Sequence, residues 1–384
     1  MAKIEFIATA AFGLEAVVAK ELKVLGYTDQ LVENGRVTFR GDEEAMCRTN
    51  LWLRSADRVL LKMGEFEAAT FEELFQQTKA LPWADLLPAD AEFPVDGKSI
   101  KSKLFSVSDC QAIVKKAIVE KIKQSYKQNW FAETGARYKI EVALLKDRAT
   151  LTVDTSGAGL HKRGYRELST KAPLRETLAA ALVRLSNWPA EQVLADPLCG
   201  SGTIPIEAAM SALNLAPGLN RRFVAESWPH IPAKLWERGR EEARSVALRG
   251  RTLRIIGTDI DEKVLSLARH HARKAGVEEY IHFQQLPLAQ FRSRYEHGSI
   301  ICNPPYGERL GEVREAEVIY REMRQVIAKH PTWSLFLLTS HLGFEQIFGR
   351  PASKKRKLYN GRIQCNYYLY HGPEPKAKER EEKV

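Results

Sequence analysis

The hydrophobic pattern changes its rhythm once along this chain of 384 residues. Over the first 155 residues, apolar runs of period two, which predict strands, alternate with stripes of period 3.6, which predict helices, such as the stripe from Leu14 to Leu25. This mixture is typical of an α+β module. Strands are predicted over residues 4–8, 35–41, 58–64, 137–144 and 149–153, and helices over residues 14–25, 43–53, 109–127 and from about residue 71.

From about residue 173, strands and helices alternate more strictly. Such alternation predicts a parallel sheet covered by helices on both faces. Near the end, Asn360-Gly361 separates two β-rich runs and predicts a two-residue hairpin, so an antiparallel pair closes the sheet. The fold class is therefore predicted as α/β, a mostly parallel sheet with an antiparallel C-terminal hairpin, preceded by the α+β module.

Charge is distributed unevenly between these two parts. The chain carries a formal net charge of +10, of which residues 1–155 hold −1 and residues 156–384 hold +11. This surplus favours a polyanion such as RNA or DNA as partner. The five cysteines lie far apart without a CxxC pair, so neither a disulfide framework nor a zinc knuckle is predicted. No apolar run is long enough for a secretory leader or a membrane span, which predicts a cytoplasmic protein without a membrane partner.

The sequence VLADPLCGSGTIPIEAA (residues 193–209) predicts a strand that ends at Asp196, a turn through Gly200 and Gly202, and a helix. Glycines there let the backbone approach a ligand at the helix N-terminus. Pro205 stands where a dinucleotide fingerprint needs its third glycine, which disfavours NAD. A carboxylate at this strand tip suits an ammonium group better than a pyrophosphate. The turn therefore predicts a cationic ligand that carries an amino acid.

The second strand of this sheet ends in IIGTDID, with two acids at its carboxyl end. A carboxylate there can accept hydrogen bonds from both hydroxyls of a ribose. Asp259 is preferred to Asp261 for this role. Gly202 precedes Asp259 by 57 residues, far more than the ~20 of a plain dinucleotide unit. An insertion between them is predicted, and LNLAPGLNRRFVAESWPHIPAKLWERGREE is the candidate.

The fourth strand of this part of the chain runs into SIICNPPYGERLG. Two prolines after Asn303 prevent strand pairing and keep the backbone extended, so the side-chain oxygen of Asn303 and the carbonyl of Pro304 can face one point. Two acceptors can bind both N–H groups of an exocyclic base amine and free its lone pair for attack, while Tyr306 stacks on the ring. The pattern predicts a site for a nucleobase amine.

These three motifs carry a resemblance to a known family. DPLCGSGT, GTDID and NPPYGERLG resemble motifs I, II and IV of class I S-adenosylmethionine-dependent methyltransferases with a Rossmann-like domain. HKRGYR followed by APLRETLAAAL, and the APGLNRRF insertion, resemble the bacterial RlmL and YpsC group of 23S ribosomal RNA guanine-N2 methyltransferases. FPVDGKSIKSKL and DCQAIVKKAI are similar to a THUMP domain, an RNA-binding module. The resemblance implies a ferredoxin-like segment (1–64), a THUMP domain (65–155), a linker (156–172), a methyltransferase domain (173–373) and a disordered tail (374–384).

The resemblance also implies residue roles. S-adenosylmethionine would lie with its methionine part on Asp196, Gly200 and Gly202, its ribose on Asp259 and its adenine against Ile260. The target base would be held by Asn303, Pro304 and Tyr306. Many relatives place an acid after the third strand to bind the adenine amine, whereas this chain has QQLPLAQF, and that contact stays unassigned between Gln285 and the backbone.

Two groups of basic residues are predicted to contact RNA phosphates. One lies on the helix near residues 109–127 and the other forms the densest basic run of the chain. The predicted RNA-binding residues are Lys116, Lys123, Lys127, Lys354, Lys355, Arg356 and Lys357.

Cysteines and histidines near the motifs could also carry chemistry. Cys302 and Cys199 are expected to be packing residues rather than nucleophiles, and His270-His271 is not expected to bind a metal because adjacent helical side chains diverge by ~100°. The prediction is an S-adenosylmethionine-dependent RNA guanine-N2 methyltransferase without a metal. The alternatives are a tRNA guanine-N2 enzyme, a DNA adenine-N6 methyltransferase and a non-catalytic RNA-binding assembly factor, with a dehydrogenase the least favoured.

Overall fold

The computed structural model describes residues 4–166, 174–306 and 310–373. The predicted disordered tail and part of the predicted linker therefore lie outside the described residues. Contacts between residues group the chain into two compact units. The first is made of the chain up to Ala10, Val18–Leu160 and Arg221–Glu242, and the second of Ala11–Val17, His161–Asn220 and the chain from Ala243 onward.

The first unit is built on one seven-stranded sheet with strand order β2-β3-β1-β4-β7-β6-β5. All neighbours pair antiparallel except β5 and β6, which are parallel. The long strand β4 pairs with β1 through its first half and with β7 through its second, so it joins the N-terminal strands to the later ones. The strands are β1 (Ile4–Ala10), β2 (Gln30–Glu33), β3 (Arg36–Gly41), β4 (Ala56–Glu67), β5 (Val95–Ile100), β6 (Ile140–Leu145) and β7 (Arg148–Asp154).

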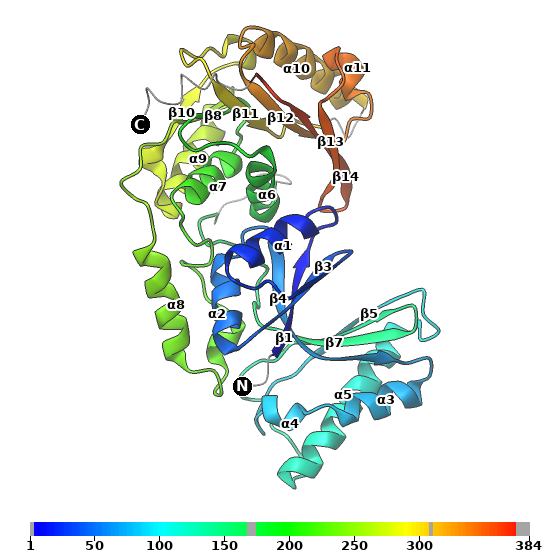
Figure 1. The fold of residues 1–384 in the computed structure, drawn as a ribbon. Coiled ribbons are helices and arrows are strands. Elements are labelled where there is room, and N and C mark those ends of the chain that lie inside the picture. The colour runs from blue at the N-terminus through cyan, green and yellow to red at the C-terminus, as the bar shows by residue number, and fades with distance from the viewer. Residues whose placement is uncertain (1–3, 167–173, 307–309, 374–384) are drawn as a thin grey trace. The chain divides into compact units, whose positions relative to one another are not determined.

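Five helices accompany this sheet in the chain. A capping box at Thr70 begins α3, whose Glu73 returns a hydrogen bond to the backbone of Thr70. Helices α3, α4 and α5 lie together at the β5–β7 end of the sheet (Figure 1). The helices are α1 (Glu15–Val24), α2 (Glu43–Trp52), α3 (Phe71–Ala80), α4 (Trp83–Leu86) and α5 (Val107–Tyr126).

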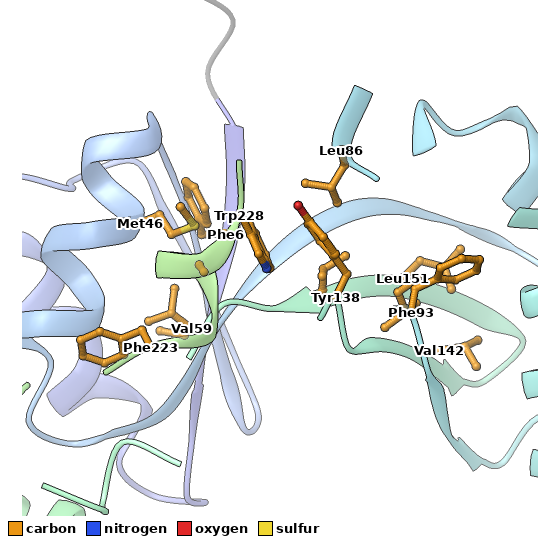
Figure 2. Close-up of a cluster of buried hydrophobic side chains, with 14 of the residues drawn as sticks. Phe6, Met46, Val59, Leu86, Phe93, Tyr138, Val142, Leu151, Phe223 and Trp228 are labelled. Atoms are coloured by element: carbon orange, nitrogen blue, oxygen red, sulfur yellow. The ribbon is translucent and has the colours of Figure 1, made fainter. Parts of the chain in front are cut away.

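The segment Arg221–Glu242, which is the larger part of the predicted insertion at residues 213–242, belongs to the first unit. Trp228 is fully buried in the core of that unit and stacks on Tyr138 at 4.6 Å between ring centroids. Its indole N–H donates to the carbonyl of Arg137 at 3.0 Å. Figure 2 shows Trp228 and Phe223 within the same apolar cluster as Phe6. The segment therefore completes a core that is otherwise made by residues before 161.

The second unit holds a seven-stranded sheet with order β10-β9-β8-β11-β12-β14-β13. The first five strands in that order are parallel. Strand β14 pairs antiparallel with β12, and β13 pairs antiparallel with β14. This confirms the predicted fold class, including the hairpin at Asn360-Gly361, where Gly361 has φ +63°. The strands are β8 (Val193–Asp196), β9 (Ile255–Asp259), β10 (Ile281–Gln285), β11 (Gly298–Cys302), β12 (Ser334–Thr339), β13 (Lys354–Asn360) and β14 (Ile363–Tyr370).

Helices cover both faces of this sheet. One face packs with α6, α7 and α9 around residues such as Leu182 and Ile206, and the other packs with α10 and α11 around Tyr320 and Phe344. No described helix is long and apolar enough to cross a membrane. The helices of this unit are α6 (Glu176–Ser186), α7 (Thr203–Ala212), α9 (Glu262–Ala275), α10 (Leu310–Ala328) and α11 (Phe344–Phe348), with short 3₁₀ turns η2 (Glu278–Tyr280) and η3 (Leu288–Gln290). The turn η1 (Val224–Ser227) and all but the last three residues of α8 (Ala233–Ser245) belong to the first unit.

Candidate active site

Three of the predicted motifs meet at one edge of the second sheet. Strand β8 pairs in parallel with β9 on one side and with β11 on the other, with Asp196 opposite Gly257 and Ala195 opposite Ile300. The residues after these strands therefore emerge at the same carboxyl edge. The strand order also reverses direction at β8, which is where ligands bind in open parallel sheets.

The glycine turn after β8 has a backbone conformation that only glycine adopts easily. Gly200 has φ +51° and Gly202 has φ +81°, a left-handed conformation that favours glycine. A Cβ on Gly202 would lie 3.0 Å from the Cβ of Ala268 and 3.1 Å from the ring of Phe283, so this glycine lets the turn pack against α9 and β10. A Cβ on Gly200 would meet nothing within 4 Å, so this glycine borders open space, as a ligand-facing backbone must.

Asp196 is a buried acid at the tip of β8. Its Oδ1 accepts a hydrogen bond from the backbone N–H of Leu198 at 3.2 Å. Burial raises the pKa of Asp196 well above its ordinary value, and the nearby carboxylate of Asp259 raises it further. Among the described residues no basic side chain offsets this shift. A cationic group placed beside this carboxyl would favour its ionised form, and the role of Asp196 at an ammonium group stays a prediction.

Asp259 at the end of β9 is held by two backbone donors. Its Oδ2 accepts from the N–H of Gly200 and its Oδ1 from the N–H of Asp261, each at 3.0 Å. Asp261 instead caps α9, since its Oδ1 accepts from the N–H of Lys263 at 2.9 Å. Asp259 thus ties the glycine turn to its own strand, and its predicted role at a ribose stays a prediction.

Ile260 follows Asp259 and exposes 70% of its surface, which is high for an isoleucine at a strand end. Its carbonyl accepts a hydrogen bond from the side-chain amide of Gln285 at 2.8 Å. The Gln285 side chain is therefore positioned beside Ile260 with its Nε2 already engaged. The structure brings together the two residues that the sequence places near an adenine.

A buried polar network lies behind the glycine turn, and sequence reasoning did not assign it. Arg163 and Glu207 form an ion pair at 3.3 Å with both side chains at most 2% exposed, and the hydroxyl of Tyr165 donates to Glu207 at 3.1 Å. The ring of His271, buried on α9, lies 3.3 Å from the carbonyl of Ser201. Two members of this network, Arg163 and Tyr165, lie in HKRGYR, within the predicted linker (156–172). The charges of that stretch are the sequence signal for the network. The histidine has a structural partner in the turn.

The loop after β11 brings two predicted substrate residues together. The hydroxyl of Tyr306 donates to the Oδ1 of Asn303 at 2.5 Å, and the side-chain amide of Asn360 donates to the same hydroxyl at 3.4 Å. The Tyr306 ring is half-buried against the apolar core, and burial raises the pKa of Tyr306 well above its ordinary value. Pro304 is buried and Pro305 is exposed.

Two residues that the sequence did not single out support this loop. The hydroxyl of Tyr320 on α10 donates to the carbonyl of Pro305 at 3.2 Å and lies 2.8 Å from the hydroxyl of Thr339 at the end of β12. Tyr320 and Thr339 are fully buried. These contacts hold the proline pair against the sheet edge. No motif signals such partners, because they come from elements 15 and more residues away.

The predicted RNA-binding residues lie in two places. Lys116 on α5 and Lys127, which caps its C-terminus, are exposed, whereas Lys123 is half-buried and lies 3.7 Å from Glu120. Strand β13 carries the other four, and because side chains alternate along a strand, they fall on two faces rather than one patch. Lys354 and Arg356 share a face with the buried Leu358, and Lys355 and Lys357 share the opposite face. Lys355 forms an ion pair with Glu345 at 3.1 Å. Their role at RNA stays a prediction.

The two cysteines near the site are buried, Cys302 completely and Cys199 with 7% exposed. Burial raises the pKa of both thiols well above the ordinary value, which is the opposite of an activated nucleophile. In the described part of the chain, no three His, Cys, Asp or Glu side chains form a group that could hold a metal ion.

Comparison with protein families gives three matches along the chain. Residues 163–368 match the methyltransferase domain described as RMKL-like, residues 5–60 match the RlmL ferredoxin-like domain, and residues 68–154 match the THUMP domain. The chain is 52% identical over 372 residues to a Bacillus subtilis protein named as an RNA methyltransferase, YpsC, and covers 96% of both chains. It is 34% identical over 377 residues to ribosomal RNA large subunit methyltransferase K/L of Syntrophotalea carbinolica, covering 95% of this chain and about half (53%) of that relative.

Solved structures give the same architecture. A Listeria monocytogenes protein described as an N6-adenine-specific DNA methylase is 52% identical with a TM-score of 0.93, over 97% of both chains. SMU.472, a protein described as a methyltransferase and solved with SAH, is 47% identical with a TM-score of 0.92, over 98% of this chain and all of that one. The match to the methyltransferase domain, residues 163–368, spans the glycine turn, the two strand-end acids and the NPPY loop.

Proposed function

Since the chain belongs to the RMKL-like methyltransferase family, as its motifs predict, we propose that it transfers a methyl group from S-adenosylmethionine to the exocyclic N2 of a guanine in large-subunit ribosomal RNA. S-adenosylmethionine is the methyl donor of this family, and a close relative has been solved with its product SAH. The observation that carries the proposal is the loop of Asn303 and Tyr306 at the same sheet edge as Asp196 and Asp259.

The residues at the edge of the sheet fit this cofactor. Asp196, a buried acid without a basic partner among the described residues, would hold the ammonium group. Gly200, whose α-carbon borders open space, lets the ligand approach the backbone. Asp259 would accept the ribose hydroxyls and Ile260 would cover the adenine with its exposed side chain. When bound, the cofactor supplies an activated methyl on a sulfonium.

The NPPY loop would hold the target base. The amide oxygen of Asn303 has two lone pairs, so it can accept from a base amine while it also accepts from the hydroxyl of Tyr306. The carbonyl of Pro304 would accept the second amine proton. Hydrogen bonds from both N–H groups to these acceptors make the amine nitrogen more nucleophilic, and positioning supplies much of the remaining rate. As the N–CH3 bond forms, the S–CH3 bond would break to leave a neutral thioether, and the nitrogen would release one proton to solvent.

RNA is supported by the family matches and the basic residues. The THUMP match covers residues 68–154, and the two relatives are named for methyl transfer to RNA, one of them to the ribosomal large subunit. The charge of +11 on residues 156–384 suits a polyanion. An amine inside a base-paired helix is engaged, so the guanine must be flipped out or presented in a single strand.

The test is nucleoside mass spectrometry after methyl transfer. The purified protein is incubated with deuterated-methyl S-adenosylmethionine and, separately, 23S rRNA, 16S rRNA, tRNA and genomic DNA from a strain that lacks it. We expect N2-methylguanosine in the 23S fraction alone, located by primer extension. Label on tRNA guanine would identify the target as tRNA.

The rival that a specific observation favours is transfer to adenine N6 in DNA, because a relative that is 52% identical is described by that activity and an NPPY loop serves either amine. N6-methyladenine in the DNA fraction would establish it in place of the RNA activity. The variant Asn303→Ala distinguishes catalysis from binding. We expect it to abolish transfer and leave the calorimetric affinity for S-adenosylmethionine within about twofold, since its amide acts on the base.

A further inference from the structure

A short N-terminal segment belongs to the catalytic unit rather than to its own neighbours in sequence. Residues Ala11–Val17 group with the second unit, and Leu14 and Val17 are buried in its core. At Gly13 an added Cβ would lie 2.5 Å from the carbonyl of Lys357 on β13. The segment therefore packs closely against the C-terminal hairpin, and Phe12 lies beside that hairpin.

Phe12 and Tyr359 form an aromatic pair on this surface. Their ring centroids are 5.8 Å apart and the rings are nearly perpendicular at 86°. Phe12 exposes 47% of its surface, and the ammonium of Lys357 lies 5.7 Å from the centroid of the Tyr359 ring. Arg362, across the hairpin turn, is exposed. A single exposed phenylalanine needs no explanation, but here two paired rings occur with the exposed Lys357 and with Arg362 in the adjoining turn.

The pair lies one residue along β13 from a residue that contacts the predicted target loop. Tyr359 precedes Asn360, whose side-chain amide donates to the hydroxyl of Tyr306 at 3.4 Å, and that hydroxyl donates to Asn303 at 2.5 Å. The hairpin turn lies at the carboxyl edge of the sheet, because Asn366 of β14 pairs with Thr339 at the end of β12. The Tyr306 ring is half-buried, whereas Phe12 is an exposed ring whose partner Tyr359 is the chain neighbour of a residue that contacts this loop.

We propose that Phe12, Tyr359, Lys357 and Arg362 form a flanking-nucleotide platform that binds the nucleotide next to the target base in single-stranded RNA. The Phe12 ring stacks on the flanking base, the Tyr359 ring supports Phe12 edge to face, and the cations contact the phosphates. This inference rests on the proposed function, because a guanine presented to Asn303 leaves its neighbours unstacked. Unpaired RNA bases stack on aromatic side chains and their backbone follows basic grooves.

The first test measures methyl transfer to 23S rRNA by Phe12→Ala, Phe12→Trp and Tyr359→Ala. We expect the two alanine variants to raise the KM for RNA about tenfold, and Phe12→Trp to keep it near the wild-type value. The affinity for S-adenosylmethionine and the thermal midpoint should stay unchanged, because Phe12 is exposed. Unchanged RNA KM in both alanine variants would overturn the platform.

The control is Tyr295→Ala. Tyr295 has the same chemistry, with the guanidinium groups of Arg254 and Arg294 each 5.3 Å from its ring, but it precedes β11 and so lies toward the opposite edge of the sheet. We expect this variant to leave the KM for RNA unchanged. An equal rise in Tyr295→Ala would show that the effect is general charge and aromatic attraction, which also overturns the platform.

A second readout does not depend on methylation. With p-benzoylphenylalanine in place of Phe12, irradiation in the presence of 23S rRNA should crosslink the protein to RNA, and sequencing should place the crosslink beside the methylated guanine. Crosslinking without any methyl transfer by the wild type would overturn the proposed function and keep the platform. Methyl transfer by the wild type with a crosslink only between protein chains would overturn the platform and identify a protein contact.

Discussion

Asp196 shows how one residue can both destabilise the ligand-free protein and prepare it for its ligand. Because burial raises its pKa in the folded state above the ordinary value, the folded protein favours the neutral acid. The ligand-free protein therefore loses stability from this group as the pH rises from the ordinary carboxyl value through the raised one. A cationic ligand would favour the ionised form and reverse that preference.

This predicts the pH dependence of cofactor binding. As the pH falls through the raised pKa of Asp196, the carboxylate is lost and the affinity for S-adenosylmethionine should fall. Asp196→Asn should weaken binding roughly 10- to 100-fold at neutral pH, since a hydrogen bond to a charged group contributes about 1.5–3 kcal/mol. Calorimetry at several pH values checks both statements. Asp196→Asn should bind S-adenosylmethionine with the same weak affinity at low and at neutral pH. A wild-type affinity that does not change with pH would contradict the role of Asp196.

His161 gives a second pH effect, with the opposite sign. Burial lowers its pKa to about 4, and the charges of Arg175, Lys162, Arg163 and Arg166 add to the shift. The unfolded chain takes up a proton near the ordinary pKa of 6.5 while the folded chain does not, so stability falls as the pH falls from about 6.5 to about 4.

The expected result is that His161→Gln flattens this part of the stability profile. Urea unfolding of the wild type and the variant at pH 7.5 and pH 5 measures it. The wild type should lose more free energy of unfolding between the two pH values than the variant does. The effect is modest, because His161 is only half-buried. Equal losses would show that other groups govern the acid limb.

At the scale of elements, the NPPY loop depends on α10 and β12 as much as on its own sequence. Tyr320 should act as a positioning residue, because its hydroxyl supports the carbonyl of Pro305. Tyr320→Phe is expected to lower kcat about tenfold while leaving the KM and affinity for S-adenosylmethionine near normal. Steady-state kinetics with calorimetry checks the split between kcat and KM.

The matched control is Tyr370→Phe. This substitution also removes a tyrosine hydroxyl that donates to a backbone carbonyl, that of Arg350 at 3.1 Å, but Tyr370 pairs with Leu335 at the start of β12, away from the loop. Its kcat should equal that of the wild type. A similar loss in both variants would attribute the effect of Tyr320→Phe to general loosening of the sheet.

Prediction from sequence succeeded for elements with a strong local pattern. The helix from Glu43 has an Asp cap and ends one residue from the predicted limit, and the hairpin at Asn360-Gly361 follows from two residues. Strand β2 (Gln30–Glu33) was missed because its apolar residues are mostly exposed, and α4 (Trp83–Leu86) was missed because it lies in a Pro- and Asp-rich stretch. The motif residues were identified because their chemistry is local. Their supports, such as Tyr320 and the Arg163–Glu207 pair, were missed because those contacts are made by the tertiary fold.

At the scale of the whole molecule, sequence order does not predict the division into units. The insertion before β9 has Pro, Gly and charged residues typical of a surface excursion, yet Trp228 is fully buried in the first unit. Nothing local in the sequence specifies a partner such as Tyr138, which lies 90 residues earlier.

Trp228→Ala tests this packing. We expect it to lower the free energy of unfolding of the first unit by about 3–5 kcal/mol, since it leaves a large cavity beside Tyr138. Hydrogen exchange followed by mass spectrometry should show lost protection in β6 and β7 and retained protection in β8, β9 and β11. Uniform loss across both sheets would contradict two separate cores.

The alternation of segments between the two units has a consequence for synthesis on the ribosome. Because the first unit includes Arg221–Glu242, its core cannot close while only the leading 160 residues have left the exit tunnel. The nascent chain must keep an apolar surface open through translation of the glycine turn and α7. A chaperone that shields nascent chains therefore has a defined window on this protein, and release at residue 160 would yield a fragment that aggregates.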